Sequence, residues 1–340
     1  MEQKITSVVF FFCLAGLFFP VSRVLGQSEH TAKLIEGAKK EGKLVWYTSI
    51  QVPEATAIVD AFKKKFPFVG NVEVSRASAE STFNRILTEA RAGKSRFDVV
   101  AISGLEILAR HQQLLSYASP EAEAYIPEFK DRNGHWTGIY VIYYVIGYNT
   151  RFVSEKEAPR RWEDLLDSKW RGKIAIDREE YPWYATLIAA WGKEKTASYM
   201  RALAKQDIQW RKGHNLIGQL MAAGEFPVAI VYAHRTELLK ERGAPVDWAD
   251  SVDPVVTSVS SIGLSAKAPN PNTAKLFVDF VLSKEGQHLL RSQSRVPARL
   301  DVQPFSPKMD QRNLKLKMVP EDLGVRYNEY VQEFRSIFGL

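Results

Sequence analysis

The sequence predicts an α/β protein made of two lobes that are joined by two strand crossings. Buried strands alternate with amphipathic helices along the chain, which is typical of parallel sheets covered on both faces. The 340 residues exceed the size at which one hydrophobic core usually stops growing. Two long extended segments, 138–148 and 255–266, are the expected crossings. We therefore expect lobe I to comprise 27–137 and 258–290, and lobe II to comprise 138–257 and 291–340.

The first 26 residues predict a secretory signal peptide. Lys4 precedes an apolar run that extends to Phe19, and the small-residue pattern Val-Leu-Gly ends at Gly26. The run is shorter than the roughly 20 residues that span a bilayer, so cleavage is favoured over a membrane anchor. Cys13, the only cysteine in the sequence, lies in this segment. The mature chain is therefore expected to be exported and to have neither disulfides nor thiolate chemistry.

Lobe I is predicted to begin with the order strand, helix, strand, helix, strand. The strands are expected at 43–49, 72–75 and 97–102. The apolar residues of the two helices recur at intervals of three and four, as Ile58, Val59, Phe62 and Phe66 and then as Phe83, Ile86, Leu87 and Ala90. Lobe II repeats this alternation. Its strands are expected at 173–176, 208–210 and 227–232, and its helices at 183–191, 195–204 and 215–223. A last stripe at 274–281 predicts a helix that packs back on lobe I.

The residues that follow the predicted strands are the candidate binding residues. Ligands of open α/β sheets bind beyond the carboxyl ends of the strands, so these residues are expected to line one cleft between the lobes. Hinge motion of the lobes would then close the cleft. The candidates are Thr48, Ser49, Ser78, Ser103, Asp177, Trp183, Tyr184, His214 and Tyr232.

Several of these candidates also have a purely structural interpretation. Ser78 can cap the helix that follows and so present its free N–H groups to an anion, but Glu80 competes for the same positive helix end. Trp183 and Tyr184 can stack on a solute or pack into the core. A lone loop histidine such as His214 is common at protein surfaces as well as in sites. The group is therefore a stronger prediction than any one member.

The sequence shows no signature of catalysis or metal binding. It lacks HExxH, GxSxG, Walker and GxGxxG motifs and any set of histidines and cysteines at metal-ligand spacing. Without Lys4, Arg23 and Glu2, the 46 basic and 39 acidic residues become 44 and 38, and they are spread over helix faces. This pattern argues against nucleic-acid binding. We expect a monomeric binding protein with no cofactor and no metal.

Several segments resemble the bacterial extracellular solute-binding proteins of ABC transporters, in the branch that includes ferric-iron-binding proteins. They are AKLIEGAKKEGKLVWYTS near the start, followed by AFKKKFP, FDVVA and YNT. The most specific segments are APRRWEDLLDSKWRGKIAI at 158–176 and NPNTAKLFVDFVLSKEGQ at 270–287. The resemblance covers nearly the whole mature chain. It implies a type II periplasmic-binding fold, a periplasmic location, and delivery of a small-molecule solute to an ABC permease in the inner membrane.

The resemblance leaves the solute open. Iron-binding members usually have adjacent tyrosines after the strand that corresponds to PVAIVY, whereas Tyr232 is followed here by Ala233. Many of them also have a histidine after the first strand, where this chain has Ser49. Ferric iron needs several hard oxygen ligands, so we expect a small organic or phosphorylated anion instead. The alternatives are a ferric-iron-binding protein of the same fold, a secreted hydrolase, and a signalling module that reports solute occupancy.

Overall fold

The computed structural model describes residues 21–320 and 322–340. The predicted signal peptide, residues 1–26, lies mainly outside the described residues, and only its end falls in helix α1 (Val21–Glu41). Within the described ranges, no helix combines the length and apolar character that a bilayer crossing requires.

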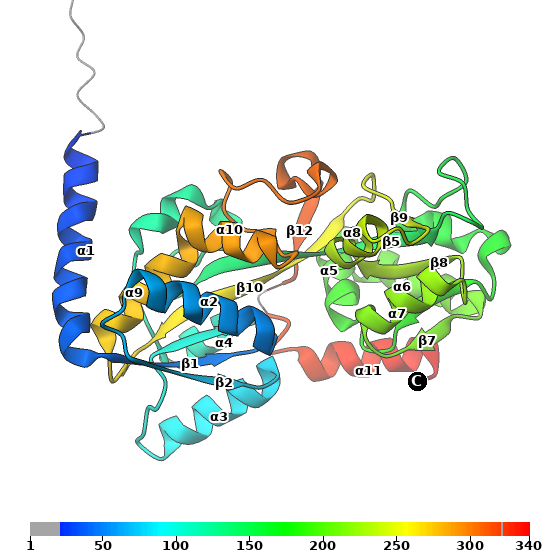
Figure 1. Cartoon of the computed structure of the whole chain (residues 1–340). Helices are drawn as coiled ribbons and strands as arrows, with labels where there is room; N and C mark the ends of the chain where they lie inside the picture. Colours follow the sequence, from blue (N-terminus) through cyan, green and yellow to red (C-terminus); the bar gives the residue numbers. More distant parts are fainter. Residues whose placement is uncertain (1–20, 321) are drawn as a thin grey trace, which may run out of the picture.

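Lobe I, on the left in Figure 1, is a parallel sheet with helices on both faces. Its parallel strands are β1 (Lys43–Thr48), β2 (Asn71–Arg76) and β3 (Val99–Ile102), and the short β4 (Leu114–Leu115) pairs antiparallel with β10 (Val255–Ser265). Its helices are α1, α2 (Val52–Lys65), α3 (Ala79–Arg91), α4 (Leu105–Arg110), α9 (Pro271–Leu282) and α10 (Lys284–Ser292). The stripe at 274–281 does pack on lobe I, because the Phe277 ring lies 5.0 Å from the Trp46 ring of β1. The predicted order of strands and helices is thus confirmed for this lobe.

Lobe II, on the right in Figure 1, has the same layered construction. Its strands are β6 (Ile174–Asp177), β7 (Gln209–Arg211), β8 (Val228–Tyr232) and β9 (Val246–Trp248). Its helices are α5 (Tyr181–Trp191), α6 (Lys193–Leu203), α7 (His214–Ala223), α8 (Ala233–Glu241) and α11 (Tyr327–Phe338). The sequence prediction included neither α8 nor α11.

Two long strands, β5 (Thr137–Asn149) and β10 (Val255–Ser265), connect the lobes as predicted. They pair antiparallel, with an irregularity between Ser260 and Ser261. The far end of β10 pairs with β3 of lobe I, whereas the far end of β5 pairs with β8 of lobe II. Among the described residues the sheet therefore runs without interruption in the order β2-β1-β3-β10-β5-β8-β6-β7. Figure 1 shows both strands passing through the centre of the molecule.

The segment 291–340, which we predicted in lobe II, contacts both lobes. Before strand β11 (Val296–Pro297), Arg295 forms a buried ion pair with Glu54 of α2 in lobe I. Strand β12 (Leu316–Met318) pairs with the start of β10. Helix α11 packs on α5 in lobe II, where the ring of Phe334 lies 5.9 Å from that of Tyr184.

Candidate functional site

The strand ends of lobe I place four predicted residues at the edge that faces lobe II. Thr48 is buried, and its Oγ1 donates to the carbonyl of Ala101 at 3.1 Å and accepts from the N–H of Ile50 at 3.1 Å. Ser49 is partly exposed and follows β1 directly. Ser103 and Ser78 are exposed after β3 and β2. Thr48 therefore ties two strand ends together, whereas the three serines remain accessible.

Ser78 is also the N-cap of α3. Its Oγ accepts from the N–H of Ser81 at 3.1 Å, so the structural interpretation of this residue holds. One donor of the helix end is thereby occupied by the protein itself.

The strand ends of lobe II bring three predicted residues into one buried cluster. Asp177 at the end of β6 accepts from the N–H of Gly213 at 2.8 Å, and this bond holds the start of α7 against β6. His214 begins α7, and its ring stacks on that of Tyr232 with centroids 3.8 Å apart. Nε2 of His214 lies 4.0 Å from Oδ2 of Asp177. Asp177, His214 and Tyr232 thus come together.

Two members of this cluster were not among the sequence candidates. Oε2 of the buried Glu180 lies 3.3 Å from Nε2 of His214. The ring of Tyr144, on strand β5, meets that of Tyr232 edge to face at 5.0 Å. Glu180 belongs to the DREEYPWY segment that supplied other candidates, but a glutamate in sequence is expected to face solvent.

Burial and charge act against each other in this cluster. Burial raises the pKa of Glu180, and the positive charge of His214 opposes that shift. Burial lowers the pKa of His214, but the carboxylates of Glu180 and Asp177 raise it, and the net shift is upward. Burial and nearby tyrosine and carboxylate groups raise the pKa of Tyr232 well above its usual value. The cluster therefore holds a charged or proton-sharing His–Glu pair beside a neutral phenol.

Trp183 and Tyr184 lie in the core of lobe II rather than at its surface. Trp183 is 0% exposed and packs edge-on against Trp162 at 5.2 Å. The hydroxyl of Tyr184 donates to Oε2 of Glu333 on α11 at 3.1 Å. Helix α11 covers Tyr184, whereas Trp162 and Tyr199 of lobe II cover Trp183. In this structure neither ring is accessible to a solute.

The N-terminal ends of α2 and α8 face each other across the lobes and carry a second charged group. Arg295 binds Glu54 through three contacts of 2.7 to 3.1 Å, and its guanidinium lies 4.6 Å above the Tyr140 ring. Arg235, in the first turn of α8, lies within electrostatic range of Arg295, Glu54 and Tyr140. Burial and the charge of Arg295 lower the pKa of Arg235.

Arg235 differs from the other residues of this group because it has no partner of its own. Within residues 21–320 and 322–340, its half-buried guanidinium forms no hydrogen bond and no ion pair. The adjacent His234 is buried, and burial together with the charge of Arg295 lowers its pKa well below the usual value, so its imidazole is neutral beside Arg235. A half-buried arginine that forms no ion pair with the described residues is well suited to bind an anion.

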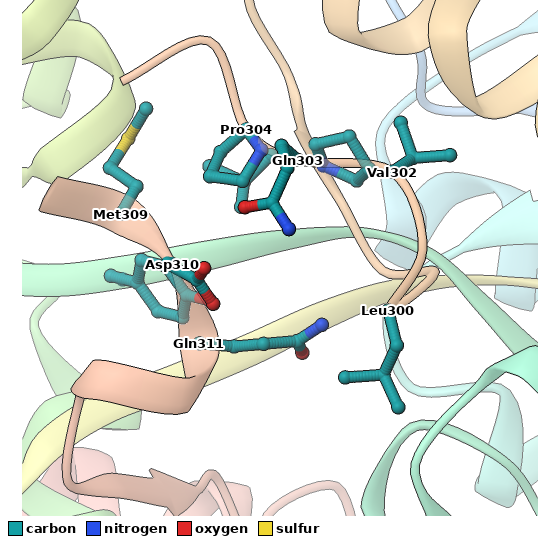
Figure 2. Close-up of a pocket in the computed structure, with 10 residues that line it drawn as sticks. Leu300, Val302, Gln303, Pro304, Met309, Asp310 and Gln311 are labelled. Atoms are coloured by element: carbon teal, nitrogen blue, oxygen red, sulfur yellow. The ribbon is translucent and has the colours of Figure 1, made fainter. Parts of the chain in front are cut away.

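A separate pocket lies on the outer side of the crossing strand β5 (Figure 2). It is a small pocket lined by Tyr143, Val296, Pro297, Leu300, Val302, Gln303, Pro304, Met309, Asp310 and Gln311. None of the candidate residues lines it. Among the described residues, no group of three or more histidine, cysteine, aspartate or glutamate side chains is placed to hold a metal ion.

Comparison with known proteins gives consistent relatives in sequence and in structure. An uncharacterized protein of Haemophilus influenzae is 27% identical over 273 residues, which are 75% of this chain and 77% of that protein. The Fe(3+)-binding periplasmic protein of Serratia marcescens is 21% identical and covers 70% of this chain and 77% of its own length.

Two solved structures have the same two-lobed fold. Iron-bound HitA from Pseudomonas aeruginosa superimposes with a TM-score of 0.76 at 24% identity, covering 88% of this chain and 99% of HitA. AfuA from Actinobacillus pleuropneumoniae, with fructose-6-phosphate bound, gives 0.73 at 25% identity, with 88% of this chain and 99% of AfuA covered. These likenesses confirm the predicted fold of two lobes with strand crossings.

A family profile described as bacterial extracellular solute-binding protein matches residues 102–321, which include both crossing strands and most of lobe II. The match covers more than half of the sequence and agrees with the resemblance found in the sequence itself. The chain belongs to the family of bacterial extracellular solute-binding proteins.

Proposed function

We propose that this protein captures a small organic anion between its lobes in the periplasm and delivers it to an ABC importer of the inner membrane. Arg235 carries this proposal. It is half buried where the two lobes meet and lacks a counter-charge of its own, while Glu54 neutralises its neighbour Arg295. A phosphate, phosphonate or carboxylate group would supply the missing charge through charge-assisted hydrogen bonds.

The cluster at the strand ends of lobe II favours a polar body on the same solute. Tyr232 supplies a phenol and a ring face, and the buried carboxylates of Asp177 and Glu180 place negative charge beside it. Carboxylates accept hydrogen bonds from hydroxyl or amine groups and repel a second anionic group. A solute with one anionic end and a hydroxyl-bearing body, such as a sugar phosphate, therefore suits both Arg235 and this cluster. AfuA, which shares this fold, holds fructose-6-phosphate.

Closure would follow from binding. The two lobes are linked by β5 and β10, and a solute that touches both lobes binds the closed state more tightly than the open one. The energy of closure thus comes from the difference in contacts between the two states. We propose that the protein acts as a monomer, without turnover of the solute, and that the closed form is the one recognised by the permease.

A thermal-shift screen of the purified mature protein tests the solute class. Fructose 6-phosphate, 2-aminoethylphosphonate, citrate and inorganic phosphate should include at least one compound that raises the melting temperature, because a ligand that binds only the folded form stabilises it. Arg235→Gln should abolish that rise. Arg201→Gln, at an exposed position of α6, is the matched control and should retain it. A full response in the Arg235→Gln variant would remove Arg235 from the site.

Ferric iron is the second candidate, and one observation favours it. Tyr144, Tyr232, Asp177 and Glu180 gather hard oxygen atoms around His214. Against iron, burial strongly raises the pKa of both phenols, so a phenolate ligand is costly to form. Adding ferric citrate distinguishes the two proposals, because iron bound by a phenolate produces a visible charge-transfer band. An absorbing complex that survives the Arg235→Gln change would favour iron.

A further inference from the structure

The C-terminal segment between β12 and α11 contacts both lobes. At its start, the N–H of Val319 donates to the carbonyl of Thr257 on β10 at 2.9 Å. Farther on, Gly324 lies against α4 of lobe I, where a Cβ added at Gly324 would meet Cδ1 of Ile107 at 2.0 Å. The segment ends in α11, which is packed on lobe II. Figure 1 shows α11 beginning beside lobe I and running along lobe II.

The position of Gly324 matters because α4 follows Ser103 directly. Ile107 is in the first helical turns after the end of β3, one of the strand ends that face lobe II. The segment therefore lies beside the tip of lobe I, on the face of the sheet that carries α3 and α4. The arginine group borders the first turns of α2 and α8 through Glu54 and Arg235.

Tyr327 is the first residue of α11. Its side chain lies between the strand ends of lobe I and those of lobe II. Its ring meets that of Tyr181, the residue after Glu180, edge to face at 5.7 Å. The carboxylates of Glu179 in lobe II and Glu80 in lobe I are both within electrostatic range. Tyr327 thus has neighbours on both sides of the cleft.

The Tyr327 ring remains accessible, unlike the predicted aromatic residues Trp183 and Tyr184. It is 46% exposed, and its hydroxyl has no hydrogen-bond partner among the described residues. Burial, Tyr181, Glu179 and Glu80 raise its pKa while Arg335 opposes the shift, so the phenol is neutral. A tyrosine with a free hydroxyl and a free ring face is well suited to contact a ligand at low entropic cost.

We propose that Tyr327 is a specificity-determining residue of the solute site, which the C-terminal segment supplies, and that it contacts the hydroxyl-bearing body of the solute. This inference rests on the proposed function. The flanking carboxylates of Glu80 and Glu179 disfavour an anionic group at this position, so the anionic end of the solute lies on the side of Arg235. Tyr327 therefore selects the body of the solute, whereas Arg235 binds its charge.

Calorimetric titration with two probes separates these roles. Tyr327→Ala should weaken fructose 6-phosphate binding about tenfold or more and leave inorganic phosphate binding within about twofold of the wild type. The affinity of Tyr327→Phe for fructose 6-phosphate should lie between those of the wild type and Tyr327→Ala, because phenylalanine keeps the ring and loses the hydroxyl. Phe152→Ala, at a side chain that is 59% exposed in the loop after β5, is the control and should change neither affinity. Equal losses for both probes, or no loss for either, would overturn the inference.

A second measurement tests the position of the segment without any solute. Cysteines at Ile107 and Gly324 should form a disulfide on oxidation, because a Cβ at Gly324 lies 2.8 Å from Cγ1 of Ile107, which puts the two Cβ atoms within bonding range. The mature chain offers no competing thiol if cleavage removes Cys13. Failure to cross-link would place the segment elsewhere and overturn the inference.

The two proposals fail in different ways. If neither fructose 6-phosphate nor phosphate binds the wild-type protein while the cross-link forms, the proposed solute class is refuted, and the role assigned to Tyr327 is refuted with it. If the wild-type protein binds and Tyr327→Ala binds equally well, only the role of Tyr327 is refuted.

Discussion

Replacing Glu54 by glutamine is expected to destabilise the protein strongly. Glu54 and Arg295 are only 11% and 9% exposed and share contacts of 2.7 to 3.1 Å, so the pair is desolvated and bidentate. Glutamine retains the shape of the side chain but removes its charge. Arg295 would then remain buried with no counter-charge and with Arg235, a second arginine, nearby.

The size of the effect follows from the burial of the pair. Removing one partner of a buried ion pair costs about 3–5 kcal/mol. An unfolding entropy of about 2.1 cal/mol/K per residue gives roughly 0.65 kcal/mol/K for about 310 residues. The melting temperature should therefore fall by about 5–8 °C.

Differential scanning calorimetry measures this shift, and the chain offers a matched control. Glu285 pairs with Lys65 at 2.6 Å but is 54% exposed. Because an exposed pair is worth about 0–1 kcal/mol, Glu285→Gln should lower the melting temperature by less than about 2 °C. The double variant Glu54→Gln with Arg295→Met should recover most of the lost stability, since it removes the unpaired charge. A Glu54→Gln shift no larger than that of Glu285→Gln would refute this account of the pair.

Two further predictions concern packing and pH. Gly286→Ala should lower the free energy of unfolding, measured in urea, by about 1–3 kcal/mol or more. The added Cβ would lie 2.3 Å from the carbonyl oxygen of Phe280 and 2.6 Å from that of Val281, and these backbone atoms cannot move away easily. The His214 pKa is raised in the folded protein, so its contribution to stability is complete below the unfolded pKa of about 6.5 and is lost as pH rises through the folded value. Unfolding free energies measured from about pH 6 to about pH 9 should fall more steeply for the wild type than for His214→Gln, and parallel curves would contradict the assignment.

The layered fold could be predicted because its signals are local. The strand at 43–49 and the helix stripes from Ile58 and Phe83 depend only on the spacing of apolar residues, and each appears as β1, α2 and α3. The crossing strands could be recognised from their unusual length. Helix α8, with the sequence AHRTELLKE, is mostly polar and has no apolar stripe that would distinguish it.

The site could be predicted only in part, because burial of charge depends on tertiary contacts. Asp177, His214 and Tyr232 could be predicted to lie together because they end or follow strands, and strand ends converge by topology. Arg235 and Glu180 could not be found in this way, since a charged residue in sequence is expected to be solvated. Trp183 was misplaced for the opposite reason: it follows a strand closely, but other side chains of lobe II bury it, the Trp162 ring among them.

Small-angle X-ray scattering with and without solute tests the central claim, that a small anion is held between two lobes that close on it. For the compound that stabilises the wild-type protein, saturation should reduce the radius of gyration, and Arg235→Gln at the same concentration should show no change. Calorimetric proof that this compound binds the wild type, together with an unchanged radius of gyration, would contradict capture by lobe closure.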